Sequence, residues 1–97
     1  MSIEVTDEAV GVLRRSLELG RVDTATGGVR LRGARGLGGG MDVQVELADS
    51  PFDDEEVIVA GGVRIFVDPE VTRAIPNAVV TVEPQHEVVV VRPAPGD

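Results

Sequence analysis

Two short apolar runs joined by a glycine pair place the strongest constraint on the fold of this chain. The runs are VIVA, residues 57–60, and VRIFV, residues 63–67, with Gly61 and Gly62 between them. This pattern is typical of a β-hairpin with a two-residue turn. Valine dominates the apolar residues, and the chain contains two Phe, no Tyr and no Trp. We therefore expect an aliphatic core built on β-sheet.

Further strands are indicated by alternating or continuous apolar residues. Residues 28–34, GVRLRGA, alternate Val29 and Leu31 with arginines, and residues 41–48, MDVQVELA, alternate apolar with polar side chains. Each segment predicts a half-buried strand. Residues 77–82 and 87–93 predict two more strands, the second with its valine run covered on both faces. A short strand is also expected at the N-terminus.

Two helical segments are expected, and only the first is long. Thr6 is a good N-cap, and Asp7 and Glu8 place negative charge in the first turn, where the helix dipole favours it. An apolar stripe at helical spacing follows, and Gly20 stands where a helix end is expected. Asp68-Pro69 predicts a second, single-turn helix, with the aspartate as N-cap.

The predicted fold class is therefore α+β. We expect a small mixed or antiparallel β-sheet domain with about seven short strands, one N-terminal helix and one short helical turn. The expected organisation is a single domain over residues 1–93 and a loose C-terminal tail over residues 94–97.

Charge and composition exclude several classes of function. The formal net charge is −8 and no basic stripe is visible, so binding to nucleic acid or to an anionic membrane is disfavoured. No signal peptide and no apolar stretch long enough for a membrane span is present, so we expect a cytoplasmic protein. The chain has no cysteine, which removes disulfides, thiolate nucleophiles and cysteine-ligated metal sites.

A glycine-rich loop, RGLGGGMD at residues 35–42, is the first candidate site. A phosphate-binding loop must lead into a helix, whereas this loop leads into a segment with the period of a strand. Three alternatives remain open: an ordinary loop, a loop inherited from a metal or cluster site, and a ligand site. In the last case, Arg35 and the backbone N–H groups of Gly38, Gly39 and Gly40 would bind an anion.

His86 is a weak candidate metal ligand, because Glu83 and Glu87 flank it in EPQHE. The acidic run at residues 53–56 lacks the spacing of a calcium loop and is interpreted as a solubilising turn. No serine has a fixed base near it in the sequence, and we therefore predict that the protein is not an enzyme. The serines concerned are Ser2, Ser16 and Ser50.

Taken in order, four segments resemble the HesB/IscA family of A-type iron–sulfur cluster carriers. They are IEVTDEAVGVLRRSLE, GVRLRGARGLGGGMDVQVEL, VIVAGGVRIFVDPE and VEPQHEVVVVRP, and together they cover roughly residues 3–93. The resemblance implies a HesB-like fold, protein partners that include iron–sulfur assembly components, and a possible homo-oligomer.

The chain departs from this family at every expected thiolate ligand. The resemblance places the first ligand cysteine of the family at Gly38, and the C-terminal Cys-Gly-Cys would lie beyond VVVVRP, where this chain has APGD. We therefore expect no cofactor and no metal, and a non-catalytic interaction or accessory protein related to the cluster carriers. The alternative is a small-ligand or metal-binding module that uses the glycine-rich loop at residues 35–40.

Overall fold

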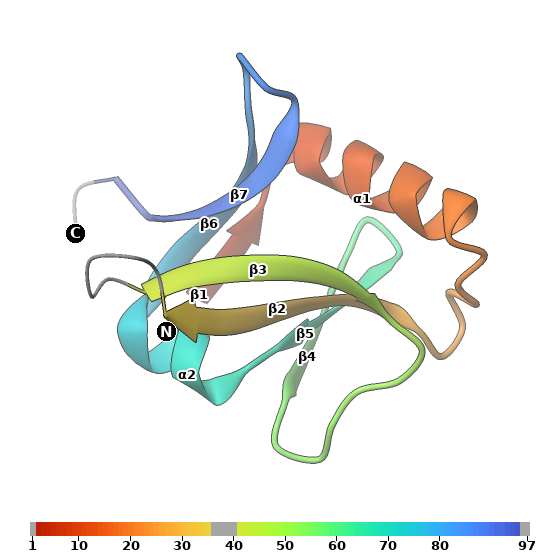
Figure 1. Ribbon diagram of the computed structural model, residues 1–97, viewed down its shortest axis with the longest axis horizontal. Coiled ribbons are helices and arrows are strands. Elements are labelled where there is room, and N and C mark those ends of the chain that lie inside the picture. Colours follow the sequence, from red (N-terminus) through yellow and green to blue (C-terminus); the bar gives the residue numbers. More distant parts are fainter. Residues whose placement is uncertain (1, 36–40, 96–97) are drawn as a thin grey trace.

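Seven strands and two helices make up the described part of the chain (Figure 1). The computed structural model describes residues 2–35 and 41–95. The predicted α+β class and the predicted elements are confirmed. In chain order the elements are β1 (Ser2–Val5), α1 (Asp7–Leu19), β2 (Gly28–Arg35), β3 (Met41–Ala48), β4 (Glu56–Ala60), β5 (Val63–Val67), α2 (Pro69–Ala74), β6 (Asn77–Glu83) and β7 (Val88–Pro93).

The strands form two mixed sheets. The smaller sheet has the order β1-β6-β7, in which β1 is parallel and β7 antiparallel to β6. The larger sheet has the order β3-β2-β5-β4, in which β2 and β5 are parallel and the outer pairs are antiparallel. Because parallel neighbours need a crossover connection, each sheet joins segments that are far apart in the sequence.

Helix α1 begins and ends with the local signals that its sequence predicts. The Thr6 hydroxyl oxygen accepts a hydrogen bond from the Ala9 N–H at 3.2 Å. At the other end, Arg21 and Val22 donate to the carbonyls of Glu18 and Leu17, which is the Schellman arrangement. The left-handed residue is Arg21, with φ 55°, and Gly20 itself is right-handed. A Cβ atom at Gly20 would meet Cδ1 of the exposed Leu47 side chain of β3, which would have to move aside.

The β4–β5 hairpin and the start of α2 also follow the sequence prediction. Gly61 and Gly62 both have positive φ, 57° and 83°, as a type I′ turn requires. Asp68 accepts a hydrogen bond from the Glu70 N–H at 3.0 Å and so caps α2, whose first residue is Pro69. Among the described residues, neither helix is long and apolar enough to cross a membrane.

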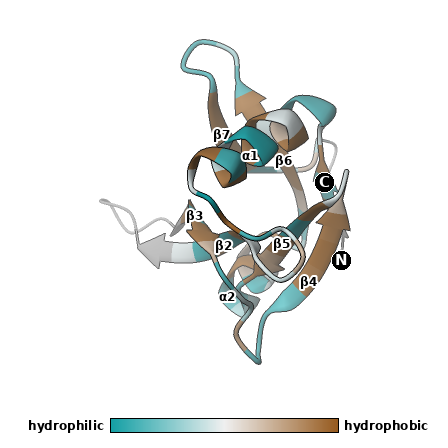
Figure 2. Ribbon diagram, turned by 90° about the vertical axis from the view of Figure 1, so that its right-hand side faces the viewer, coloured by the Kyte–Doolittle hydropathy of each residue, from teal (hydrophilic) through white to brown (hydrophobic). Residues whose placement is uncertain are grey.

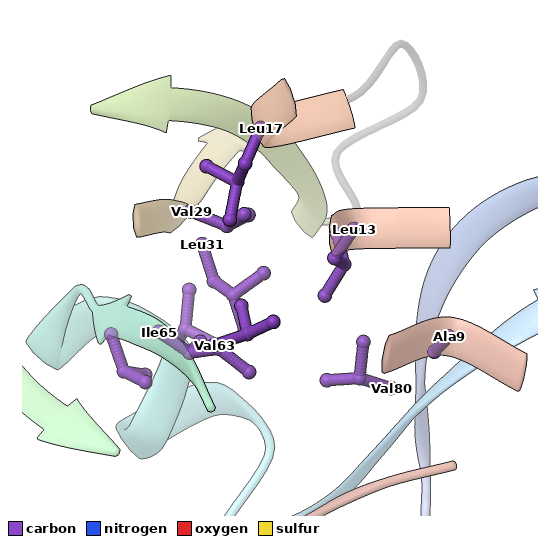
Figure 3. Packing of buried hydrophobic residues seen from close by; sticks show 10 residues of the cluster. Ala9, Leu13, Leu17, Val29, Leu31, Val63, Ile65 and Val80 are labelled. Atoms are coloured by element: carbon purple, nitrogen blue, oxygen red, sulfur yellow. The ribbon is translucent and has the colours of Figure 1, made fainter. Parts of the chain in front are cut away.

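The core lies where α1 and α2 meet the two sheets (Figure 3). It consists of ten buried aliphatic side chains, and both helices and both sheets contribute to it. Its members are Ala9, Leu13, Leu17, Val29, Leu31, Val63, Ile65, Val67, Val71 and Val80. The predicted apolar stripe of α1 therefore faces the core, as its helical spacing indicates.

The valine run of β7 is covered less than the sequence predicts, because Val89, Val90 and Val91 are half-buried and Val88 is exposed. Strand β7 lies at the edge of its sheet and pairs only with β6 among the described residues. Val89 and Val91 pack against the core, whereas Val88 is 49% exposed. Figure 2 shows the hydrophobic residues of β7 next to α1, below a hydrophilic β6–β7 turn. A continuous apolar run indicates a strand but does not specify its place in the sheet.

Candidate functional site

The glycine-rich loop connects β2 to β3 at the end of the hairpin where Arg35 pairs with Met41. The two strands pair over eight residues each, from Gly28 opposite Ala48 to Arg35 opposite Met41. Gly38, Gly39 and Gly40 lie outside the described residues. The backbone of Arg35 ends β2, and its side chain is also outside the description. The anion site predicted from these four residues therefore stays a prediction.

His86 lies in the turn between β6 and β7 and contacts one carboxylate. Its Nδ1 atom is 2.8 Å from Oε1 of Glu83, and its side chain is 66% exposed. Glu87, the second carboxylate of the predicted site, is not part of this contact. Within residues 2–35 and 41–95, no group of three or more His, Cys, Asp or Glu side chains is placed to hold a metal ion.

A buried ion pair between β2 and the segment before β4 was missed by the sequence analysis. Nε of Arg30 lies 2.7 Å from Oε2 of Glu55, and Nη2 lies 3.1 Å from Oε1, so the pair is bidentate. The same Nη2 donates to the Ser50 carbonyl at 2.9 Å. The side chain of Glu55 is 3% exposed and that of Arg30 is 11% exposed.

Phe52 covers this ion pair. The centre of its ring lies 3.8 Å from Cζ of Arg30, which is a cation–π distance, and its N–H donates to Oε1 of Glu55 at 2.6 Å. The interpretation of residues 53–56 as a purely solubilising turn is therefore wrong for Glu55. The alternation of apolar and basic residues in β2 also suggested that Arg30 is exposed. Arg30 is instead covered by the connection between β3 and β4, and the alternation within one strand does not reveal such a contact with a distant segment.

The ion pair shifts the pKa values of both partners. The hydrogen bonds to Glu55 raise the pKa of the Arg30 guanidinium, although burial acts in the opposite direction. Burial alone would raise the pKa of the Glu55 carboxyl, but the hydrogen bonds from Arg30 and from the Phe52 N–H lower it overall. Both groups are thus held in their charged forms, and the pair ties the β3–β4 connection to the larger sheet.

A groove between α1, β3 and β7 is a hollow of the described surface that could accept a ligand or partner. Its volume is about 520 Å³, which lies within the range of ~300–1,000 Å³ for small-molecule sites. We call it the α1–β7 groove. It is lined by Val12, Leu13 and Ser16 of α1, Val29 of β2, Val45, Glu46 and Leu47 of β3, Glu87 of the turn, and Val88 and Val89 of β7.

The fold is similar to that of solved iron–sulfur assembly proteins. The crystal structure of IscA with the [2Fe-2S] cluster superposes with a TM-score of 0.76 and 16% identity, over 94% of this chain and 82% of that one. Escherichia coli SufA, a protein involved in the biosynthesis of iron-sulfur clusters, gives 0.72 and 16%, over 94% and 77%. A solution structure of a protein from Aquifex aeolicus gives 0.69 and 18%, over 95% and 91%.

These similarities define the class of fold: the chain has the HesB/IscA-like fold that its sequence resemblance predicts. No protein-family model matches the sequence, and no curated protein sequence matches it. The similarity to IscA and SufA is therefore a similarity in the three-dimensional arrangement of the elements.

The donor atoms of this chain do not fit an iron–sulfur cluster. Such clusters are held by cysteine thiolates, with histidine as an occasional substitute. The chain has no cysteine, and its one histidine is the exposed His86. Glycine, which stands at the position of the first ligand cysteine implied by the resemblance, has no side-chain donor.

Proposed function

We propose that this protein is a non-catalytic accessory protein of iron–sulfur cluster assembly that acts through protein contacts. One combined observation carries the proposal: an IscA-like fold is built by a sequence without a single cysteine. IscA holds a [2Fe-2S] cluster in its crystal structure and SufA is involved in cluster biosynthesis. Without cysteine thiolates, the side chains of this protein cannot hold and transfer a cluster. The surfaces through which the fold contacts other proteins do not depend on those thiolates.

The proposed partners are iron–sulfur assembly proteins, and a second copy of the chain is a further candidate. Edge strands favour both, because their unpaired backbone groups can add to the strand of another molecule. Within the described residues, β7 and β4 are such edges and carry exposed valines: Val88, Val57 and Val59. We propose that the protein is located in the cytoplasm, because it would meet iron–sulfur assembly proteins there.

Affinity capture from the native host tests this function. The tagged chain would be used as bait, and captured proteins would be identified by mass spectrometry, with an unrelated acidic domain of similar size as the control bait. We expect iron–sulfur assembly proteins to be enriched over the control. Capture that contains none of them, repeated with iron-starved cells, would contradict the assignment to cluster assembly.

A further inference from the structure

Strand β4 is an uncovered edge of the larger sheet. Among the described residues it pairs only with β5, and its Val57 and Val59 side chains are 43% and 61% exposed. Residues 57–60 include no charge and no proline, which are the usual protections of an exposed edge. We propose that a second copy of this chain covers β4 by antiparallel strand pairing, with the two Ile58 residues facing each other across a two-fold axis. The inference deepens the proposed function, in which a second copy is a candidate partner.

The β4–β5 hairpin determines which backbone groups of β4 are free. Ala60 and Val63 flank its two-residue turn, and in such a hairpin this pair exchanges hydrogen bonds. Bonded and non-bonded pairs alternate along antiparallel strands. Val57 and Val59 therefore direct their N–H and C=O groups away from β5, where a second strand can bind them.

Three antiparallel registers would join these groups to those of a second copy, and two of them meet an obstacle. A register centred on Val57 places Val59 opposite Glu55, whose N–H already donates to a carbonyl of the β3–β4 connection at 3.1 Å. A register centred on Val59 needs Gly61, which has φ 57° and a carbonyl that already accepts from a guanidinium of α1. The register centred on Ile58 pairs Val57 of each copy with Val59 of the other and needs neither residue.

Charge complementarity also favours the register centred on Ile58. It places the exposed Glu56 of each copy opposite Ala60 of the other, beside the turn whose Gly61 carbonyl accepts from Arg14. One Glu56–Arg14 contact can then form at each end of the paired strands. The two Glu56 residues are four positions apart along the strands, about 14 Å, so their mutual repulsion is largely screened.

The overall charge limits how tightly two copies can associate. Each copy has a formal net charge of −8, which opposes association, and Glu18 borders the same hollow as Arg14. In favour of association are the added main-chain hydrogen bonds and two cross-strand valine pairs. We therefore expect a weak dimer in reversible exchange with the monomer.

Analytical ultracentrifugation of the intact chain from about 10 μM to about 1 mM tests association. We expect a reversible monomer–dimer equilibrium that Val59→Ser weakens about tenfold, because both copies lose an apolar contact. The control Val88→Ser makes the same change at the exposed edge of β7 and should leave the equilibrium unchanged. A chain that stays monomeric over this range, or equal effects of the two variants, would overturn the proposal.

Single cysteines at exposed positions identify the register, because the chain has no thiol of its own. The proposed register places residue 57 directly opposite residue 59, at about 5.5 Å between Cα atoms, which a disulfide can span. Identical positions lie diagonally, at about 7–8 Å. An equimolar mixture of Val57→Cys and Val59→Cys, one of them ¹⁵N-labelled, would be equilibrated in a glutathione redox buffer and analysed by mass spectrometry. We expect the mixed disulfide dimer to exceed each homodimer at least about fivefold. A statistical mixture, or an excess of either homodimer, would contradict this register.

A charge exchange tests the contact between Glu56 and Arg14. Glu56→Arg should weaken the dimer about fivefold, because two guanidinium groups then meet at each end. The double variant Glu56→Arg with Arg14→Glu keeps the net charge of −8 and should recover the wild-type affinity. A double variant as weak as Glu56→Arg alone would contradict the charge complementarity that favours this register.

None of these measurements involves iron or captured assembly proteins. A monomeric chain therefore leaves the proposed function standing, and failure of the capture experiment leaves the pairing of β4 testable.

Discussion

At the scale of single residues, the Arg30–Glu55 pair has the most specific geometry in the described structure. A planar guanidinium and a carboxylate meet in a bidentate contact that is almost fully buried. Such pairs add little net stability compared with an apolar replacement, but removal of one partner leaves the other charge uncompensated. The pair therefore specifies where the β3–β4 connection lies.

We predict that Glu55→Gln lowers the free energy of unfolding by about 2–3 kcal/mol at pH 7, because the buried Arg30 then keeps only the long, 3.9 Å contact with the partly exposed Glu46 as its counter-charge. Urea denaturation would measure the change. Asp53→Asn removes the same charge from an exposed position of the same connection and should change stability by less than about 0.5 kcal/mol. Equal effects of the two variants would show that the ion pair is not what stabilises this connection.

The contribution of Glu55 also has a defined pH dependence. Its pKa is lower in the folded protein than in the unfolded chain, so its contribution to stability is complete above the unfolded pKa of ~4.3. This contribution falls as the pH drops from that value through the folded pKa. The stability difference between wild type and Glu55→Gln should therefore shrink between about pH 5 and the more acidic folded pKa. A difference that stays constant on acidification would contradict this assignment.

At the scale of secondary-structure elements, the β4–β5 turn depends on both of its glycines, but for different reasons. Both residues have positive φ, which costs other L-residues about 1–2 kcal/mol. At Gly61, a Cβ atom would also lie 2.6 Å from Cγ1 of Val10 in α1, whereas at Gly62 the nearest atom would be 3.9 Å away. We predict that Gly61→Ala destabilises the protein by about 1 kcal/mol more than Gly62→Ala does. Thermal unfolding of the two variants would measure this difference, and equal losses would show that the turn does not pack against α1.

Helix α1 contains one glycine with no packing role. Gly11 is exposed, and a Cβ atom there would meet nothing within 4 Å. Because alanine is the better helix former, we predict that Gly11→Ala raises the free energy of unfolding by about 0.5–1 kcal/mol. This corresponds to a rise in Tm of about 2–8 °C for a domain of this size. An unchanged or lower Tm would indicate that Gly11 serves a purpose other than helix formation.

Elements that depend on local signals could be predicted from the sequence. Thr6 caps α1, Asp68-Pro69 opens α2, and the glycine pair joins β4 to β5 as expected. The edge position of β7 could not be predicted, because strand order is set by contacts between distant segments. The burial of Arg30 and Glu55 was missed for the same reason, since their pairing joins residues that are 25 positions apart.

At the scale of the whole molecule, an aliphatic core accounts for the fold without metal ligands. Its ten buried side chains come from both helices and both sheets, so folding brings the two sheets together through apolar burial. The candidate site was less predictable than the fold. The glycine-rich loop was singled out from its composition, whereas the α1–β7 groove is lined by four elements, α1, β2, β3 and β7, and had no local signature in the sequence.

We propose that this IscA-like fold does not hold an iron–sulfur cluster with its own side chains. Iron and acid-labile sulfide per chain, measured after anaerobic reconstitution and desalting, test it most directly, with a cysteine-containing A-type carrier treated in parallel. We expect substoichiometric iron and no visible cluster absorption for this chain, alongside a loaded and coloured reference carrier. Stoichiometric iron and sulfide that remain with this chain through desalting would contradict the claim.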